Sequence, residues 1–240
     1  MIRKEEISKH DMILMIHGAG ATSLSFNYIS LWLDQEIQFL DYRVGETRDE
    51  IFQRIERPDE IQYIIGHSYG GLLASLWLGQ TKRNYCKGLV TIASPWQGSP
   101  TARILNWFLS DPVWNDMKPG SDLLKEVNSL DLSLPIKNIV ANPVQGGNGL
   151  AALGRSENDG TIPVNSARST PTGFSKCHSV EIPHGHAEIL QSWDTVEHIR
   201  KFLDNPQGHF VQQATRSEEH IRNSMAQIQL GYDPLMKRNR

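Results

Sequence analysis

The sequence predicts an α/β fold in which a mostly parallel sheet is covered by helices on both faces. Short apolar runs alternate with stretches of helical periodicity, which is the pattern of strands joined by crossover helices. Each run is short enough to be one buried strand. A chain of 240 residues with 39% hydrophobic content can bury a single core of that kind. One principal domain follows, over residues 1–203.

Six apolar runs are the predicted strands: residues 12–16, 37–42, 61–65, 88–93, 136–141 and 177–182. Helical spacing predicts helices over residues 24–35, 46–56, 70–81 and 193–203. Thr47 and Glu50 have the spacing of a capping box, in which each side chain satisfies a free backbone amide at the start of a helix. The elements alternate as a doubly wound sheet requires.

Residues 96–135 interrupt this alternation, because they take the place of a simple crossover connection. Ile104, Trp107 and Phe108 share one face at helical spacing, which is typical of a helix that faces the core. The alternative is an apolar lid or acyl-binding wall, in which Trp96, Trp107 and Phe108 bind substrate. The sequence leaves both open.

Two further stretches lie outside the regular pattern. The glycine-rich run from residue 145 lacks the spacing of a phosphate loop or a dinucleotide fingerprint, so we expect a flexible connection. Residues 204–240 form a predicted helical tail, with Ile221, Met225 and Ile228 on one face. The tail is expected to pack on the domain or on an unidentified protein partner.

Composition excludes several function classes. A net charge of −3 gives no basic footprint for nucleic acid, and no run reaches the length of a membrane span. Cys86 and Cys177 lack metal-type or redox-type spacing, so we expect free thiols, no metal site and no cofactor. The first residues lack the apolar core of a signal peptide, which favours a cytoplasmic location.

The pentapeptide Gly66-His67-Ser68-Tyr69-Gly70 follows the third predicted strand and precedes a predicted helix. Small residues on both sides of a serine permit a sharp strand-to-helix turn that exposes the hydroxyl. Such a serine is a nucleophile when a base and an orienting acid lie within reach. Ser68 is therefore the candidate nucleophile.

An acid and a histidine follow Ser68 in the order that this fold requires. Asp159, before a glycine and after the fifth strand, is preferred as the acid over Glu157. His186, past the sixth strand, is preferred as the base over His184. The oxyanion donors are predicted to be the amides of Tyr69 and Ala19, while His17 and His67 are expected to organise the site.

Together these motifs resemble the α/β-hydrolase superfamily, in its lipase-like branch that includes GPI inositol-deacylase-like proteins. Residues 93–99 and 117–124 are similar to two further segments of that branch, and the likeness covers residues 12–203. Trp96 stands where the branch usually has a histidine. The first two strands of a full-length hydrolase sheet have no counterpart in this sequence. No calcium ligands can be assigned.

The resemblance implies a serine esterase or lipase that acts through Ser68, Asp159 and His186, and the insertion favours small-molecule or lipid-like acyl esters. An amidase, thioesterase or acyltransferase would use the same acyl-enzyme, and the sequence does not separate them. A binding module that has lost catalysis is the remaining alternative, because a fold does not fix a function.

Overall fold

The computed structural model describes residues 11–82, 85–100, 111–143 and 157–206. These residues form a six-stranded sheet in the order β2-β1-β3-β4-β5-β6, and every pairing between neighbouring strands is parallel. The strands are β1 Met12–Ile16, β2 Glu36–Leu40, β3 Ile61–His67, β4 Gly88–Ile92, β5 Ile136–Ala141 and β6 Cys177–Ile182. The predicted α/β architecture, with a parallel sheet of about six strands, is confirmed.

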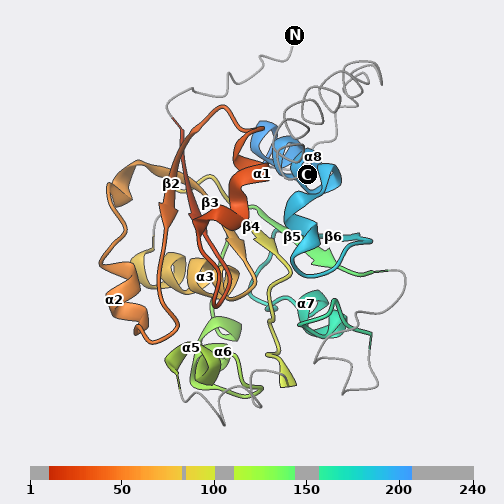
Figure 1. Cartoon of the computed structure of the whole chain (residues 1–240). Helices are drawn as coiled ribbons and strands as arrows, with labels where there is room; N and C mark the ends of the chain where they lie inside the picture. Colours follow the sequence, from red (N-terminus) through yellow and green to blue (C-terminus); the bar gives the residue numbers. More distant parts are fainter. Residues whose placement is uncertain (1–10, 83–84, 101–110, 144–156, 207–240) are drawn as a thin grey trace, which may run out of the picture. The chain divides into compact units, whose positions relative to one another are not determined.

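Helices and single turns connect the strands (Figure 1). The α-helices are α1 Asn27–Ser30, α2 Arg48–Phe52, α3 Tyr69–Thr81, α5 Pro112–Asp116, α6 Asp122–Asn128, α7 Val164–Arg168 and α8 Trp193–Asp204. The 3₁₀ turns are η1 Ser23–Phe26, η2 Pro58–Glu60 and η4 Glu188–Gln191.

Alternation along β1 shows how the sheet divides two apolar layers. Met12, Leu14 and Ile16 face one core with α2, α3, α5 and α6. Ile13 and Met15 face the other core, which contains residues of α1, η4 and α8. All five are buried, because a central parallel strand has helices on both sides.

Local sequence explains where two of the helices begin. Thr47 accepts a hydrogen bond from the amide of Glu50, and the Glu50 carboxylate accepts one from the amide of Thr47, so the predicted capping box is confirmed. Ser121 caps α6 by accepting from the amide of Leu124 at 3.2 Å. The polar caps satisfy amides that have no partner within the helix.

Several predicted boundaries change in the structure. The helix expected over 24–35 is wrong in extent, since the chain forms η1 and then one turn of α1, and the helix expected over 46–56 contracts to α2. The predicted strand 37–42 is replaced by β2, which ends at Leu40 because Tyr42 turns inward and stacks on His17.

Contacts divide the chain into two units at residue 208, and the described residues all belong to the first. The predicted tail lies outside the described residues from 207 onward, as does most of the glycine-rich run expected to be a flexible connection. In the insertion, the described part contains α5 and α6. Because the six strands are parallel, their carboxyl ends share one edge of the sheet, where ligand sites of such sheets occur.

Candidate active site

Ser68 lies in a strained turn between β3 and α3. Its φ of 53° and ψ of −122° belong to a region that residues with a Cβ seldom adopt. The Ser68 amide donates to the carbonyl of Ile92 at 2.8 Å, which ties the turn to β4. The predicted strand-to-helix turn with serine at its apex is present.

The two glycines of the pentapeptide permit close backbone approach. A Cβ on Gly66 would lie 2.6 Å from the carbonyl oxygen of Gly70, and a Cβ on Gly70 would lie 2.1 Å from the carbonyl oxygen of Ile16. Both contacts are with backbone, which has little room to move. The glycines therefore bring the start of α3 against the end of β1.

The turn after β1 lies directly against the serine turn. A Cβ on Gly18 would be 3.1 Å from the Ser68 Cβ and 3.0 Å from Nδ1 of His67. The neighbouring Ala19 is partly exposed. This turn therefore lies beside the candidate nucleophile, where an oxyanion donor is needed.

His17 fixes the orientation of the peptide group between Gly18 and Ala19. Its Nδ1 lies 2.8 Å from the Gly18 carbonyl, and its Nε2 accepts from the Tyr42 amide at 3.2 Å, so Nδ1 is the donor. Burial lowers the pKa of His17, against the opposing effects of the Gly18 hydrogen bond and Asp41. In a trans peptide, the Ala19 amide points away from the restrained carbonyl.

The carboxylate of Asp159 is held by backbone donors in the loop after β5. Oδ1 accepts from the amides of Thr161 at 2.9 Å and Ile162 at 2.6 Å. Gly160, with φ of 101°, supplies the backbone conformation that this tight turn requires. The side chain is 1% exposed, so a single orientation presents Oδ2 to its neighbour.

That neighbour is His186, on the loop between β6 and η4. Its Nδ1 lies 2.7 Å from Oδ2 of Asp159, and its amide donates to the Asp159 carbonyl at 2.8 Å. The imidazole is 12% exposed. Because Nδ1 is the donor to the carboxylate, Nε2 is left as an acceptor, which is the tautomer that a general base needs.

His67 links this loop to the serine turn. Its Nε2 donates to the carbonyl of His186 at 2.9 Å, and the two ring centroids are 4.8 Å apart. Burial lowers the pKa of His67 to about 3, with a smaller contribution from the charge of His186. At neutral pH His67 is therefore neutral, with its single ring proton on Nε2, and it anchors the backbone of His186 through that proton.

The other predicted site residues have different surroundings. Glu157 is exposed and pairs with Arg168 at 3.4 Å. His184 is partly buried, and its amide donates to the carbonyl of Ile182. The structure brings Asp159 together with His186, and Glu157 and His184 take no part in that contact.

Trp96 is fully buried in the core beside α6. Its indole meets the ring of Phe174 edge to face, with centroids 5.5 Å apart, and its Nε1 donates to Asn138 at 3.4 Å. Trp96 is a packing residue in this structure, and its role in substrate binding stays a prediction. Trp107 and Phe108 lie outside the described residues.

Sequence reasoning missed two residues that border the site. Tyr42 stacks on His17 at 4.2 Å and donates its hydroxyl hydrogen to the His17 carbonyl at 2.9 Å. Asp116 accepts from the Tyr69 hydroxyl at 2.7 Å. Neither has a local motif, although a tyrosine in the variable position beside the nucleophile indicates a polar group that needs a buried partner.

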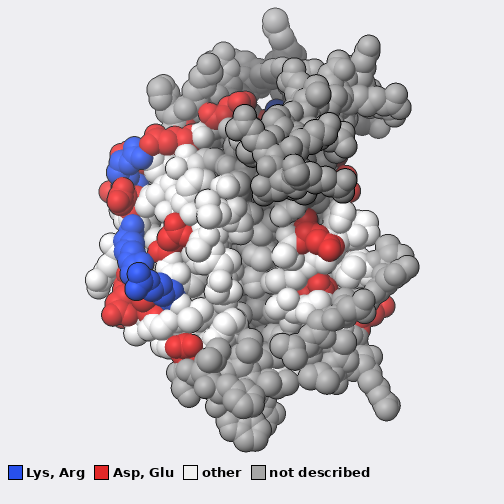
Figure 2. All heavy atoms as spheres, viewed as in Figure 1, with Lys and Arg blue, Asp and Glu red and all other residues white. Residues whose placement is uncertain are grey.

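Among the described residues, no cluster of three or more His, Cys, Asp or Glu side chains could hold a metal ion. None of their helices combines the length and apolar composition needed to cross a bilayer. On the face in Figure 2, basic side chains gather at the left margin and alternate with acidic ones. Among the basic residues, Arg54 pairs with Glu46, and Arg57 pairs with Glu36.

No protein-family model matches the sequence, and no curated protein matches it. Solved structures do match. Bacillus licheniformis lipase BlEst2 in mature form has a TM-score of 0.58 at 17% identity, over 82% of this chain and 93% of that chain. A monoacylglycerol lipase of Paleococcus ferrophilus has a TM-score of 0.56 at 15% identity, over 83% and 95%.

The metagenomic carboxyl esterase MGS0156 is a third match, with a TM-score of 0.59 at 12% identity, over 85% of this chain and 77% of that chain. Similarity at such low identity is a similarity of fold. The chain has the α/β-hydrolase fold, and its architecture is similar to that of lipases and esterases.

Proposed function

We propose that the protein is a serine hydrolase that cleaves carboxylic esters through Ser68, His186 and Asp159. The observation that carries the proposal is the hydrogen bond between His186 and Asp159. The loop that contains His186 is anchored by His67, which precedes Ser68 in the sequence. A buried carboxylate with two backbone donors orients the base. Ser68, the residue after His67, has the strained turn conformation that is typical of a nucleophilic serine.

The reaction begins when Ser68 Oγ attacks the ester carbonyl carbon and His186 Nε2 takes the hydroxyl proton. The tetrahedral oxyanion accepts hydrogen bonds from the amides of Tyr69 and Ala19. Collapse breaks the carbon–oxygen bond to the alcohol, which leaves with the proton from His186. Water then attacks the acyl-enzyme and gives a proton to His186. The second tetrahedral intermediate collapses by breaking the bond between the acyl carbon and Ser68 Oγ, His186 returns the proton to Oγ, and the carboxylic acid leaves.

Labelling with a fluorophosphonate probe tests the nucleophile, because the probe forms a covalent bond to an activated serine. Native protein should label, and Ser68→Ala should not. Ser75→Ala is the matched control, since Ser75 is a buried serine on α3 that donates only to the carbonyl of Gly71, at 2.9 Å. Labelling that survives Ser68→Ala, or none in the native protein, would refute the assignment.

The substrate class is tested with nitrophenyl esters of increasing acyl length. The lipid-like part of the proposal rests on the apolar composition of residues 96–135, and kcat/KM should rise with chain length. A preference for the acetyl ester would contradict the lipid-like part of the proposal and would indicate an esterase that acts on esters of short-chain acids. Faster turnover of matched amides or thioesters would move the assignment to those bonds.

A further inference from the structure

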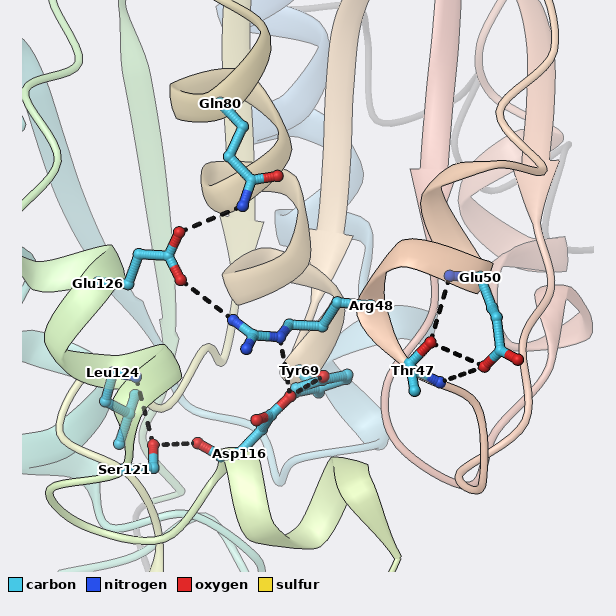
Figure 3. Close-up of polar contacts among 9 residues, drawn as sticks. All are labelled: Thr47, Arg48, Glu50, Tyr69, Gln80, Asp116, Ser121, Leu124 and Glu126. Carbon is cyan, nitrogen blue, oxygen red and sulfur yellow. Dashed lines mark hydrogen bonds and ion pairs between the residues drawn. The ribbon is translucent and has the colours of Figure 1, made fainter.

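Tyr69 is anchored at its hydroxyl as well as along its ring. Its amide is one of the two proposed oxyanion donors, and its side chain, 1% exposed, lies in the core that also contains residues of α2, α5 and α6. The hydroxyl donates to Oδ2 of Asp116 at 2.7 Å (Figure 3). A short hydrogen bond to a carboxylate is stronger than one between neutral groups.

Asp116 lies at the end of α5, in the insertion between β4 and β5, and is joined to three neighbouring elements. Arg48 of α2 approaches its Oδ2 with Nε at 3.7 Å and also pairs with Glu126 of α6 at 3.1 Å. Gln80 of α3 donates to the other oxygen of Glu126 at 3.2 Å. Figure 3 shows this continuous set of contacts across α2, α3, α5 and α6.

The backbone of Asp116 is restrained as well. Its carbonyl accepts from the hydroxyl of Ser121, the residue that caps α6. The backbone that bears the Asp116 carboxylate is therefore held in place, and the side chain is 14% exposed. Burial raises the pKa of Asp116, while the Tyr69 hydrogen bond and Arg48 oppose that shift.

Tyr69 also contacts the residues that hold the second proposed oxyanion donor. Its ring centroid lies 6.0 Å from that of Tyr42, and Tyr42 stacks on His17, which restrains the Gly18 carbonyl. The rings of Tyr69, Tyr42 and His17 thus form one packed group that contacts both turns proposed to supply oxyanion donors. A shift of the Tyr69 ring would therefore disturb the positions of both donors.

We propose that Asp116 is a positioning residue that holds the oxyanion hole through the hydroxyl of Tyr69 and couples the insertion to the nucleophile turn. This inference rests on the proposed function. Hydrogen-bond donors stabilise a developing oxyanion only when they are already in place. Tyr69 follows a strained residue, so its amide direction depends on what restrains its side chain, and Asp116 supplies that restraint from a segment outside the sheet.

Tyr69→Phe removes the hydroxyl and keeps the ring, while Asp116→Ala removes the acceptor. Each should lower kcat for nitrophenyl acetate by about tenfold, less than the loss of a donor outright, with KM changed by less than about twofold because the ester is still bound. Asp116→Asn keeps an acceptor oxygen and should restore most of kcat. The double variant should be no slower than either single variant, because both remove the same contact.

Matched controls separate positioning from general destabilisation. Tyr85→Phe removes a tyrosine hydroxyl whose acceptors are the Pro58 carbonyl and the Asp59 carboxylate. Asp122→Asn removes an exposed carboxylate of α6 that pairs with Lys125. Both should keep the native kcat. Thermal unfolding of every variant identifies those that fail to fold, and the Asp116→Asn comparison then still tests the restraint.

Native kcat in Tyr69→Phe and Asp116→Ala would overturn the inference, and so would independent effects that multiply in the double variant. A rise in KM with unchanged kcat would also overturn it, because that result assigns the pair to substrate binding. If the native protein labels at Ser68 while these results are found, the inference fails and the proposed function stands. Native protein that neither labels nor hydrolyses esters refutes both.

Discussion

Replacing Asp159 by asparagine tests the acid through the hydrogen bonds that surround it. The side-chain oxygen Oδ1 accepts from two backbone amides, at 2.9 and 2.6 Å. An asparagine must place its carbonyl oxygen there, because its NH₂ group would face two donors. The NH₂ group is then directed at His186, 2.7 Å from Nδ1, where two donors would meet.

His186 relieves that conflict by moving its proton from Nδ1 to Nε2. Nε2 then carries a hydrogen and cannot take the proton of Ser68. The same tautomer change in a serine-protease triad lowers kcat by about 10⁴, which corresponds to roughly 5.5 kcal/mol at about 1.36 kcal/mol per tenfold change. We expect a loss of this order in Asp159→Asn, with the fold retained because the two backbone donors remain satisfied.

The assay is kcat for nitrophenyl acetate at neutral pH, together with thermal unfolding. Glu157→Gln is the matched control, since Glu157 is a carboxylate of the same loop that is exposed and pairs with Arg168. It should keep kcat within about twofold, as expected of a surface group. Near-native turnover in Asp159→Asn, or a comparable loss in Glu157→Gln, would refute the assignment of the acid.

Two further predictions concern the serine turn. Burial lowers the pKa of His67 from 6.5, its ordinary value, to about 3 in the folded protein. As pH falls below 6.5, the unfolded chain therefore binds a second proton on this imidazole while the folded protein does not, and the free energy of unfolding decreases until the pH reaches about 3. His67→Gln should reduce the slope of unfolding free energy against pH by up to about 1.4 kcal/mol per unit, measured by urea denaturation; equal slopes would contradict this. Gly70→Ala places a methyl group 2.1 Å from a backbone oxygen and should abolish fluorophosphonate labelling, whereas Gly20→Ala, with φ of 71° and no atom within 4 Å, should cost only about 1–2 kcal/mol and still label.

The parallel sheet could be predicted from the sequence because buried strands are continuous apolar runs. Residues 136–141 and 177–182 match β5 and β6 in full. Boundaries depend on contacts that periodicity does not contain. β3 continues to His67 because that residue pairs with Ile92 of β4, and the helix expected from residue 24 stops at Ser30, which leaves Leu24 and Leu31 exposed.

The order of the proposed triad was predictable, whereas the contacts that orient it were not. Asp159 and His186 follow Ser68 as the fold requires. The bonds from His67 to His186 and from Tyr69 to Asp116 join residues 119 and 47 positions apart. No local pattern marks such pairs, because tertiary packing brings them together.

The position of β6 determines when the proposed site can become complete during synthesis. β6 pairs with β5 at the edge of the sheet, and His186 lies on the loop that follows it. The serine turn, in contrast, contacts only the earlier strands β1, β3 and β4 in the contacts described above. Domains fold in part while the ribosome is still extending the chain. The nascent protein can therefore form its serine turn before the proposed base, His186, is in place, and the proposed hydrolysis requires β6 to have joined the sheet.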